Sequence, residues 1–147
     1  MFKKGNRLFS VSNLTLLLVA ALHTYGSFRE PMGDEEIRVL ETMKGYSFEA
    51  MGMNWSIHDV LVCLALTMTI FLVFVAVMNF FLLYWISSRG LLRKLILANS
   101  LLMWTLALLY FVFQIPPPFL CFVLLGILFT LSYIRFSSNA EENGDKF

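Results

Sequence analysis

Four long apolar stretches divide the chain, and polar connections of very different lengths separate them. The stretches run over about residues 8–28, 57–86, 95–115 and 117–136. A helix needs roughly 20 apolar residues to cross the hydrocarbon core of a bilayer, and each stretch meets or approaches that length. The stretches lack the alternating polarity of barrel strands, and backbone groups in lipid need partners within their own segment, so helices are expected.

The pattern therefore predicts an all-α fold, an integral membrane four-helix bundle formed as one domain over residues 1–147. Hydrophobic residues make up 59% of the sequence and charged residues 14%, whereas a soluble chain carries about a quarter charged residues. A soluble fold of this size would have too little polar surface to enclose the apolar stretches. We expect the lipid bilayer to surround the chain, with self-association or contact with other membrane proteins as further options.

The connection between the first two stretches, residues 29–56, is polar and acidic. Pro31 suits a first helical turn, and the carboxylates that follow it stabilise the positive end of a helix. Apolar residues then recur at helical spacing, and Gly45 favours a stop. This segment predicts a short amphipathic helix from about Pro31 to Lys44, lying on the bundle or at the membrane interface.

The remaining connections are short. Residues 87–94 predict a tight turn around Gly90, and the three prolines at 116–118 predict a second turn because they cannot continue the preceding helix. The tail, residues 137–147, is polar and acidic, so we expect it to be disordered.

Lys and Arg are concentrated in three of the five segments outside the apolar stretches. Those three segments hold Lys3, Lys4, Arg7, Arg89, Arg93, Lys94 and Lys146, and Arg135 ends the last apolar stretch on the same side, whereas residues 29–56 hold Arg29, Arg38 and Lys44 among six carboxylates. Basic residues accumulate on the cytoplasmic side of membrane proteins. Both termini and residues 87–94 are therefore expected in the cytoplasm, and residues 29–56 outside it, in a bacterial inner membrane or single cell membrane.

The first stretch has an alternative interpretation as a cleaved signal peptide, because Lys3 and Lys4 precede the apolar run. The apolar character extends from Leu8 to Phe28, which is longer than the apolar region of a typical signal peptide. We therefore favour a membrane span.

With this topology His23 lies near the outer end of the first span and Asp59 at the outer start of the second. Ionisable groups within spans are costly and usually face protein or water, so these two are the candidate catalytic residues. A carboxylate beside an imidazole stabilises imidazolium and supports proton transfer. In the alternative interpretation Asp59 caps its helix and His23 bonds a backbone carbonyl, because such polar contacts are ordinary in membrane bundles. The candidate ligand-binding residues around them are Tyr25, Arg29, Asn54, Trp55 and His58.

Two polar stripes are expected to face each other or the bundle interior, since small and weakly polar residues allow close helix approach in lipid. The first stripe holds Asn13, Ala20, His23 and Ser27, and the second holds His58, Ala65, Thr69, Ala76 and Asn79.

Metal binding is a further hypothesis. Met51, Met53 and His58, with His23, Met32 and Met43 as additional donors, are ligand types that copper accepts. Methionine is more often packing material, and no closely spaced ligand pair such as HxxxH is present. Cys63 and Cys121 form no CxxC pair, which argues against a thioredoxin-like centre and a thiolate zinc site. We predict no cofactor.

The chain contains no GxSxG, HExxH, P-loop or GxGxxG motif. No basic cluster is interleaved with aromatic residues, so nucleic acid is not expected as a partner.

Several short motifs carry a resemblance to one family. They are His23-Thr-Tyr-Gly26, Pro31 and Met43, Phe48-Glu-Ala-Met51-Gly52, Ser56 with Asp59, and the prolines between the last two spans. In these features the chain resembles an uncharacterised family of small bacterial four-helix integral membrane proteins, over most of residues 8–136. The family pattern HTxGH has a second histidine near the position of Phe28, so a two-histidine site does not carry over. The resemblance implies the four-helix topology and brings no established activity.

The sequence thus predicts a small multi-pass membrane protein of unknown biochemical activity and favours a binding or structural module over an enzyme. The alternative function is a membrane enzyme acting on a lipid or quinone-like substrate through His23 and Asp59. An extracytoplasmic copper-binding protein is the third option.

Overall fold

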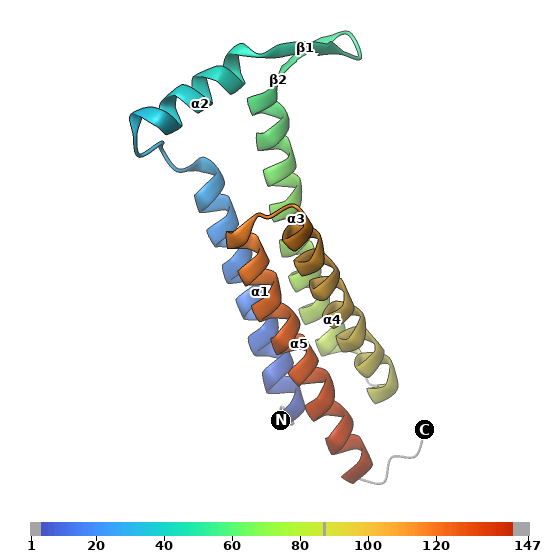
Figure 1. Cartoon of the computed structure of the whole chain (residues 1–147). Coiled ribbons are helices and arrows are strands. Elements are labelled where there is room, and N and C mark those ends of the chain that lie inside the picture. The colour runs from blue at the N-terminus through green and yellow to red at the C-terminus, as the bar shows by residue number, and fades with distance from the viewer. Residues whose placement is uncertain (1–3, 87, 143–147) are drawn as a thin grey trace. The chain divides into compact units, whose positions relative to one another are not determined.

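The computed structural model describes residues 4–86 and 88–142, which are mostly helical. Four long helices follow one another: α1 (Lys4–Phe28), α3 (Ile57–Trp85), α4 (Arg89–Val112) and α5 (Pro116–Glu142). Between α1 and α3 lie a short helix, α2 (Asp34–Gly45), and a two-stranded hairpin of β1 (Ser47–Ala50) and β2 (Met53–Ser56). Figure 1 shows this order along the chain.

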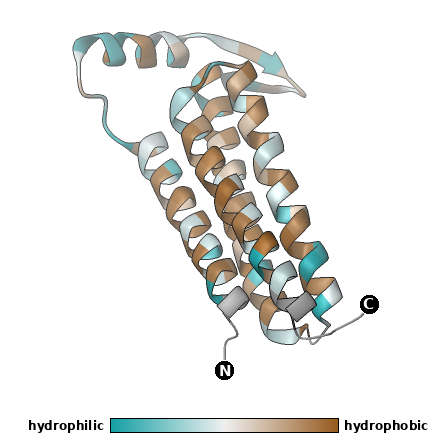
Figure 2. Cartoon of the chain, turned by 60° about the horizontal axis from the view of Figure 1, so that its bottom comes forward, coloured by the Kyte–Doolittle hydropathy of each residue, from teal (hydrophilic) through white to brown (hydrophobic). Residues whose placement is uncertain are grey.

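All four long helices are long and apolar enough to cross a membrane, over Arg7–Phe28, Ile57–Trp85, Arg89–Val112 and Pro116–Ser138. Figure 2 shows apolar residues predominating along them. The prediction of a mostly helical chain with four candidate spans is confirmed. By length and composition, the protein is a multi-pass membrane protein.

The described residues form two compact units, one of residues 4–19 with 73–86 and 88–142, and one of residues 20–72. The first, which we call the bundle unit, contains parts of all four long helices. Its buried apolar side chains come from each of them, for example Phe9, Ala76, Ile96 and Phe129. The Phe9 and Phe129 rings meet edge to face with centroids 5.9 Å apart. A packed four-helix core is therefore present in this unit.

Within the bundle unit α4 and α5 are in close contact at Gly126. A Cβ on Gly126 would lie 3.0 Å from Cε2 of Trp104, so the missing side chain leaves room for the indole ring. The indole N–H donates to Thr130 Oγ1 over 3.1 Å, and Ser100 Oγ lies 2.8 Å from the same oxygen. Small and hydroxyl-bearing residues thus join the two helices, as they commonly do in membranes.

The second unit, which we call the hairpin unit, holds the end of α1, the helix α2, the hairpin and the start of α3. The predicted amphipathic helix is present, and it begins at Asp34, three residues later than Pro31. Gly33 is its N-cap and Asp34, Glu35 and Glu36 fill the first turn. That turn places three carboxylates at the positive end of the helix, where they are favourable.

The hairpin was not predicted from the sequence. Its strands pair antiparallel with Ala50 opposite Met53, which leaves Met51 and Gly52 as a two-residue turn. Both turn residues have positive φ, 56° and 75°. Positive φ at both positions is the requirement of a type I′ turn, whose twist matches that of the strands. Glycine meets the requirement at the second position, whereas Met51 adopts it at a cost.

Two predicted connections differ from the observed ones. α4 begins at Arg89, so most of the predicted turn 87–94 is helical, and Ser88 caps the helix by accepting from the Leu91 N–H over 3.4 Å. α5 begins at Pro116, with the three prolines in its first turn, where the missing N–H groups need no intrahelical acceptor. The turn before it falls at Gln114, which has a φ of 55°.

The tail also differs from its prediction. α5 continues to Glu142, so residues 137–142 are helical where disorder was expected. Ser138 Oγ donates to the Ile134 carbonyl over 3.1 Å within this extension. The rest of the predicted disordered tail, residues 143–147, lies outside the described residues.

Candidate functional site

Asp59 lies in the first turn of α3, where it forms a reciprocal cap with Ser56. The Asp59 N–H donates to Ser56 Oγ over 3.1 Å. In return, the Ser56 hydroxyl and backbone N–H both donate to Asp59 Oδ2, over 2.6 and 3.1 Å. This is a capping box, in which two otherwise unpaired backbone N–H groups of a helix start are satisfied. The geometry therefore gives the Asp59 carboxylate a structural role at the start of α3.

His58 adds a second contact to the same carboxylate. Its Nδ1 lies 3.9 Å from Asp59 Oδ1, and its side chain is 31% exposed. A separation of this size places the two groups within ion-pair range when His58 is protonated, without a direct hydrogen bond.

His23 lies in the last turns of α1 and has a different environment. Its Nε2 is buried and has no hydrogen-bond partner among the described residues. The adjacent Thr24 hydroxyl donates to the Ala20 carbonyl and lies 3.1 Å from the Thr69 hydroxyl of α3. A buried nitrogen without a partner is unusual, because leaving a polar group unsatisfied costs free energy.

The two candidate catalytic residues have separate partners. Among the described residues of the hairpin unit, the polar partners of Asp59 are Ser56 and His58. No hydrogen bond or ion pair joins Asp59 to His23 among these residues. An acid–base pair needs its groups within hydrogen-bond reach of the same reacting atom. The pairing of His23 with Asp59 accordingly stays a prediction.

The candidate ligand-binding residues lie in different parts of the hairpin unit. Tyr25 is 68% exposed near the end of α1. Asn54 and Trp55 lie in β2, where Trp55 pairs across the hairpin with Phe48. Arg29 lies just beyond α1 and is the candidate ligand-binding residue that lines a pocket.

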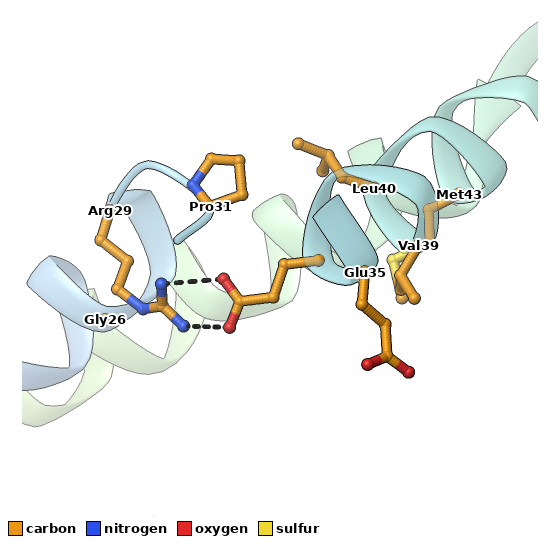
Figure 3. Close-up of a pocket in the computed structure, with 8 residues that line it drawn as sticks. Gly26, Arg29, Pro31, Glu35, Val39, Leu40 and Met43 are labelled. Atoms are coloured by element: carbon orange, nitrogen blue, oxygen red, sulfur yellow. Dashed lines mark hydrogen bonds and ion pairs between the residues drawn. The ribbon is translucent and has the colours of Figure 1, made fainter. Parts of the chain in front are cut away.

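That pocket has a volume of about 630 Å³ and lies between the end of α1 and helix α2. Gly26, Arg29 and Pro31 line it from the end of α1 and the connection. Glu35, Glu36, Val39, Leu40 and Met43 line it from α2. Figure 3 shows the guanidinium of Arg29 reaching across to the α2 side. The volume falls in the range of small-molecule sites.

Arg29 and Glu36 form a two-pronged ion pair in this pocket. The guanidinium donates to both carboxylate oxygens of Glu36 over 3.0 and 2.8 Å, and the Met32 N–H donates to the same carboxylate over 2.8 Å. These hydrogen bonds, first of all those from Arg29, lower the pKa of Glu36 from 4.5 to about 2. The bond to Glu36 likewise raises the pKa of Arg29. Both groups are therefore charged at neutral pH.

Two of the candidate copper ligands, Met51 and Met53, are strongly exposed, whereas the His58 side chain is 31% exposed. Met51 is 97% exposed at the hairpin turn and Met53 is 53% exposed at the start of β2. Over residues 4–86 and 88–142, no group of three or more His, Cys, Asp or Glu side chains is placed to hold a metal ion. Cys63 and Cys121 are free.

The most extensive polar cluster lies in the bundle unit and consists of three buried asparagines. Asn79 Nδ2 donates to Asn13 Oδ1 over 2.7 Å and to Asn99 Oδ1 over 2.9 Å, and Asn99 Nδ2 donates back to Asn79 Oδ1 over 3.0 Å. Asn13 and Asn99 also donate to carbonyls of their own helices, Phe9 O and Leu95 O. We call these three residues the asparagine cluster.

The sequence pointed to two members of the asparagine cluster. Asn13 and Asn79 were placed on two stripes expected to face each other or the bundle interior, and the 2.7 Å hydrogen bond between them confirms this expectation for these two residues. Asn99 was missed. Asn99 could have been found in the sequence, because it is an uncharged polar residue inside the apolar run 95–115. A second polar contact, between Ser12 and Ser132 over 3.1 Å, joins α1 to α5 nearby.

Comparison with protein-family models, with curated proteins and with solved structures gave no match. The resemblance to a bacterial family of four-helix membrane proteins therefore stays a prediction, and the fold and the geometry carry the functional argument.

Proposed function

We propose that this multi-pass membrane protein is a binding or structural module without catalysis of its own. Both termini and the α3–α4 connection lie in the cytoplasm in this proposal, and α2 and the hairpin lie on the opposite side. The uneven distribution of Lys and Arg supports the orientation.

The observation that carries the proposal is the asparagine cluster. Asn13, Asn79 and Asn99 are 0%, 2% and 5% exposed, and their hydrogen bonds run to each other or to the carbonyl one turn earlier. Catalytic polar groups are usually left available to a substrate, whereas these amides are occupied by protein partners. Such a satisfied network holds three helices in one register.

The orientation is tested by thiol labelling of the full-length protein in intact cells. Cys63 and Cys121 are first replaced by Ala, and single cysteines are introduced by Met51→Cys and Ser88→Cys, two exposed positions. A membrane-impermeant maleimide should label the cysteine at 51 in intact cells and the cysteine at 88 only after permeabilisation. The opposite pattern would overturn the orientation, and labelling of both positions in intact cells would overturn the even number of spans.

One observation supports the alternative that the protein is an enzyme. The buried Nε2 of His23 has no hydrogen-bond partner among the described residues. This alternative predicts that His23→Gln abolishes turnover of a lipid or quinone-like substrate while the protein still folds. In the module proposal, His23→Gln and Asp59→Asn change only stability. Thermal unfolding of each variant in detergent, followed together with oxidation or hydrolysis of added quinol or phospholipid, separates the two functions.

A further inference from the structure

The pocket between α1 and α2 coincides with the end of the first candidate span. Gly26 belongs to the last turn of the span Arg7–Phe28, and Arg29 follows that span directly. The end of an apolar span lies at the level of the lipid headgroups. In a membrane-inserted chain, which is the premise taken from the proposed function, the pocket therefore opens where headgroups are most concentrated.

The pocket contains one group that can pair with an anion and one that can pair with a cation. Arg29 donates two hydrogen bonds to Glu36 and one to the Glu30 carbonyl, which accounts for three of the five N–H donors of a guanidinium. Its side chain is 33% exposed. Glu35, by contrast, is exposed and has no hydrogen-bond or ion-pair partner among the described residues. A guanidinium with N–H groups left to donate and a carboxylate without a partner among the described residues thus line one pocket.

The α2 wall of the pocket is apolar beyond the carboxylates. Val39 is 49% exposed, and Leu40 and Met43 are half-buried beside it. No residue of α2 is buried within the chain. Apolar side chains next to charged ones match a ligand with a polar head and an apolar body.

We propose that this pocket binds the headgroup of a phosphoethanolamine-type phospholipid, with its phosphate on Arg29, its ammonium on Glu35 and its glycerol and upper acyl region along Val39, Leu40 and Met43. A guanidinium pairs well with phosphate oxygens. An ammonium group donates hydrogen bonds to a carboxylate.

Charge disfavours an anionic headgroup in this pocket, and hydrogen bonding disfavours a phosphocholine headgroup. The three ionised side chains of the pocket, Arg29, Glu35 and Glu36, sum to −1. An anionic phosphoglycerol headgroup would leave Glu35 unpaired and would be repelled by it. A phosphocholine headgroup carries a cation without N–H donors, so it forms no hydrogen bond to Glu35.

The test compares headgroups on the intact protein. The full-length chain is purified in mild detergent and mixed with equal amounts of phosphatidylethanolamine, phosphatidylcholine and phosphatidylglycerol of identical acyl chains. Native mass spectrometry then reports how much of each lipid stays bound. We expect phosphatidylethanolamine to dominate the bound population, and Glu35→Gln to reduce its excess over phosphatidylcholine about threefold, as expected for an exposed ion pair.

Two matched pairs of variants separate the pocket from general effects. A side chain added at Gly26 begins in open space, and so does one added at Gly45, which lies outside the pocket. Gly26→Leu should therefore remove the phosphatidylethanolamine complex without unfolding α1, and Gly45→Leu should keep it. Likewise Glu41→Gln, on α2 but outside the pocket, should leave the headgroup preference unchanged.

The outcomes are distinguishable from failure of the proposed function. Release of the protein from membranes by alkaline carbonate would overturn membrane insertion and this inference together. Stable insertion with equal binding of the three lipids, or with a preference unaffected by Gly26→Leu, would overturn the headgroup site alone. Occupation by free phosphoethanolamine at the same concentration as the lipid would assign the pocket to a soluble ligand and would also overturn it.

Discussion

The bundle unit and the hairpin unit differ in how their polar side chains are partnered. In the bundle unit polar side chains from all four long helices are buried and bonded across helices, as in the asparagine cluster and the Ser12–Ser132 contact. In residues 20–72 the buried side chains are Ala20 and Leu72 at the margins. Apart from the Thr24–Thr69 contact between α1 and α3, the polar contacts there are local caps, turns and the exposed Arg29–Glu36 ion pair.

This difference reflects the surroundings. Where the neighbours are lipid, a polar group needs a protein partner, so its loss affects several helices together. Residues 29–56 lie outside the candidate spans; in contact with water, an unpaired group there is satisfied by solvent, and each polar contact is worth little. The bundle unit should therefore respond to substitution cooperatively, and residues 29–56 only near the site of change.

The largest effect is expected for Asn79→Ala. It removes three interhelical hydrogen bonds, which at roughly 0.6 kcal/mol each lowers the free energy of unfolding by about 2 kcal/mol. Reversible unfolding in mixed micelles measures it. Val77→Ala, on an exposed face of α3, is the control. If the two variants are equally stable, the asparagine cluster does not hold the bundle unit together.

Ser56→Ala should have a smaller and local effect. It removes the hydroxyl that both accepts from and donates to Asp59 at the start of α3, and loss of such a cap costs about 1 kcal/mol. Amide exchange should accelerate over residues 57–60 and stay unchanged in α4 and α5. Ser27→Ala serves as control, because its hydroxyl bonds only to its own helix. Faster exchange throughout α4 would contradict the separation of the two units.

Met51→Asn is expected to stabilise the hairpin slightly. Met51 holds a φ of 56°, and a side chain that tolerates this region relieves at most about 1 kcal/mol. Amide exchange at residues 48–50 should slow in the variant. Met53→Asn, at a position without positive φ, should not slow it. Unchanged exchange in Met51→Asn would show that the turn is not strained.

The smallest effect concerns the Arg29–Glu36 pair. Because the pKa of Glu36 is lowered to about 2 in the folded protein, its contribution to stability is fully present above pH 4.5 and is lost as the pH falls from 4.5 toward 2. Carboxyl-carbon NMR of Glu36 should show the low midpoint. Arg29→Gln should return the midpoint toward 4.5, and a midpoint unaffected by this change would rule out the ion pair in solution.

Much of the helical layout follows from local sequence. Hydropathy is a property of single segments, so the four apolar stretches and the acidic start of α2 predicted helices without reference to any partner. Helix ends were predicted less well, because they depend on details such as the Ser88 cap and the suitability of Pro116 for a first turn.

The hairpin shows why a short motif was insufficient. Residues 48–52 were noted as a motif, yet the turn contains Met51 at positive φ where asparagine or glycine is usual. The strand pairing of Phe48 with Trp55 offsets this unfavourable choice. Local propensity alone therefore gave no hairpin signal.

The sequence by itself determined that the chain is helical, apolar and suited to four membrane spans, because each of these properties depends on residues adjacent in the chain. Only the tertiary structure decided that Asn13, Asn79 and Asn99 bond to one another, that Asp59 bonds to Ser56, and that Arg29 and Glu35 line one pocket. The physical reason is that hydrogen bonds act over about 3 Å. Which side chains come that close depends on helix register and rotation, and local composition does not specify either.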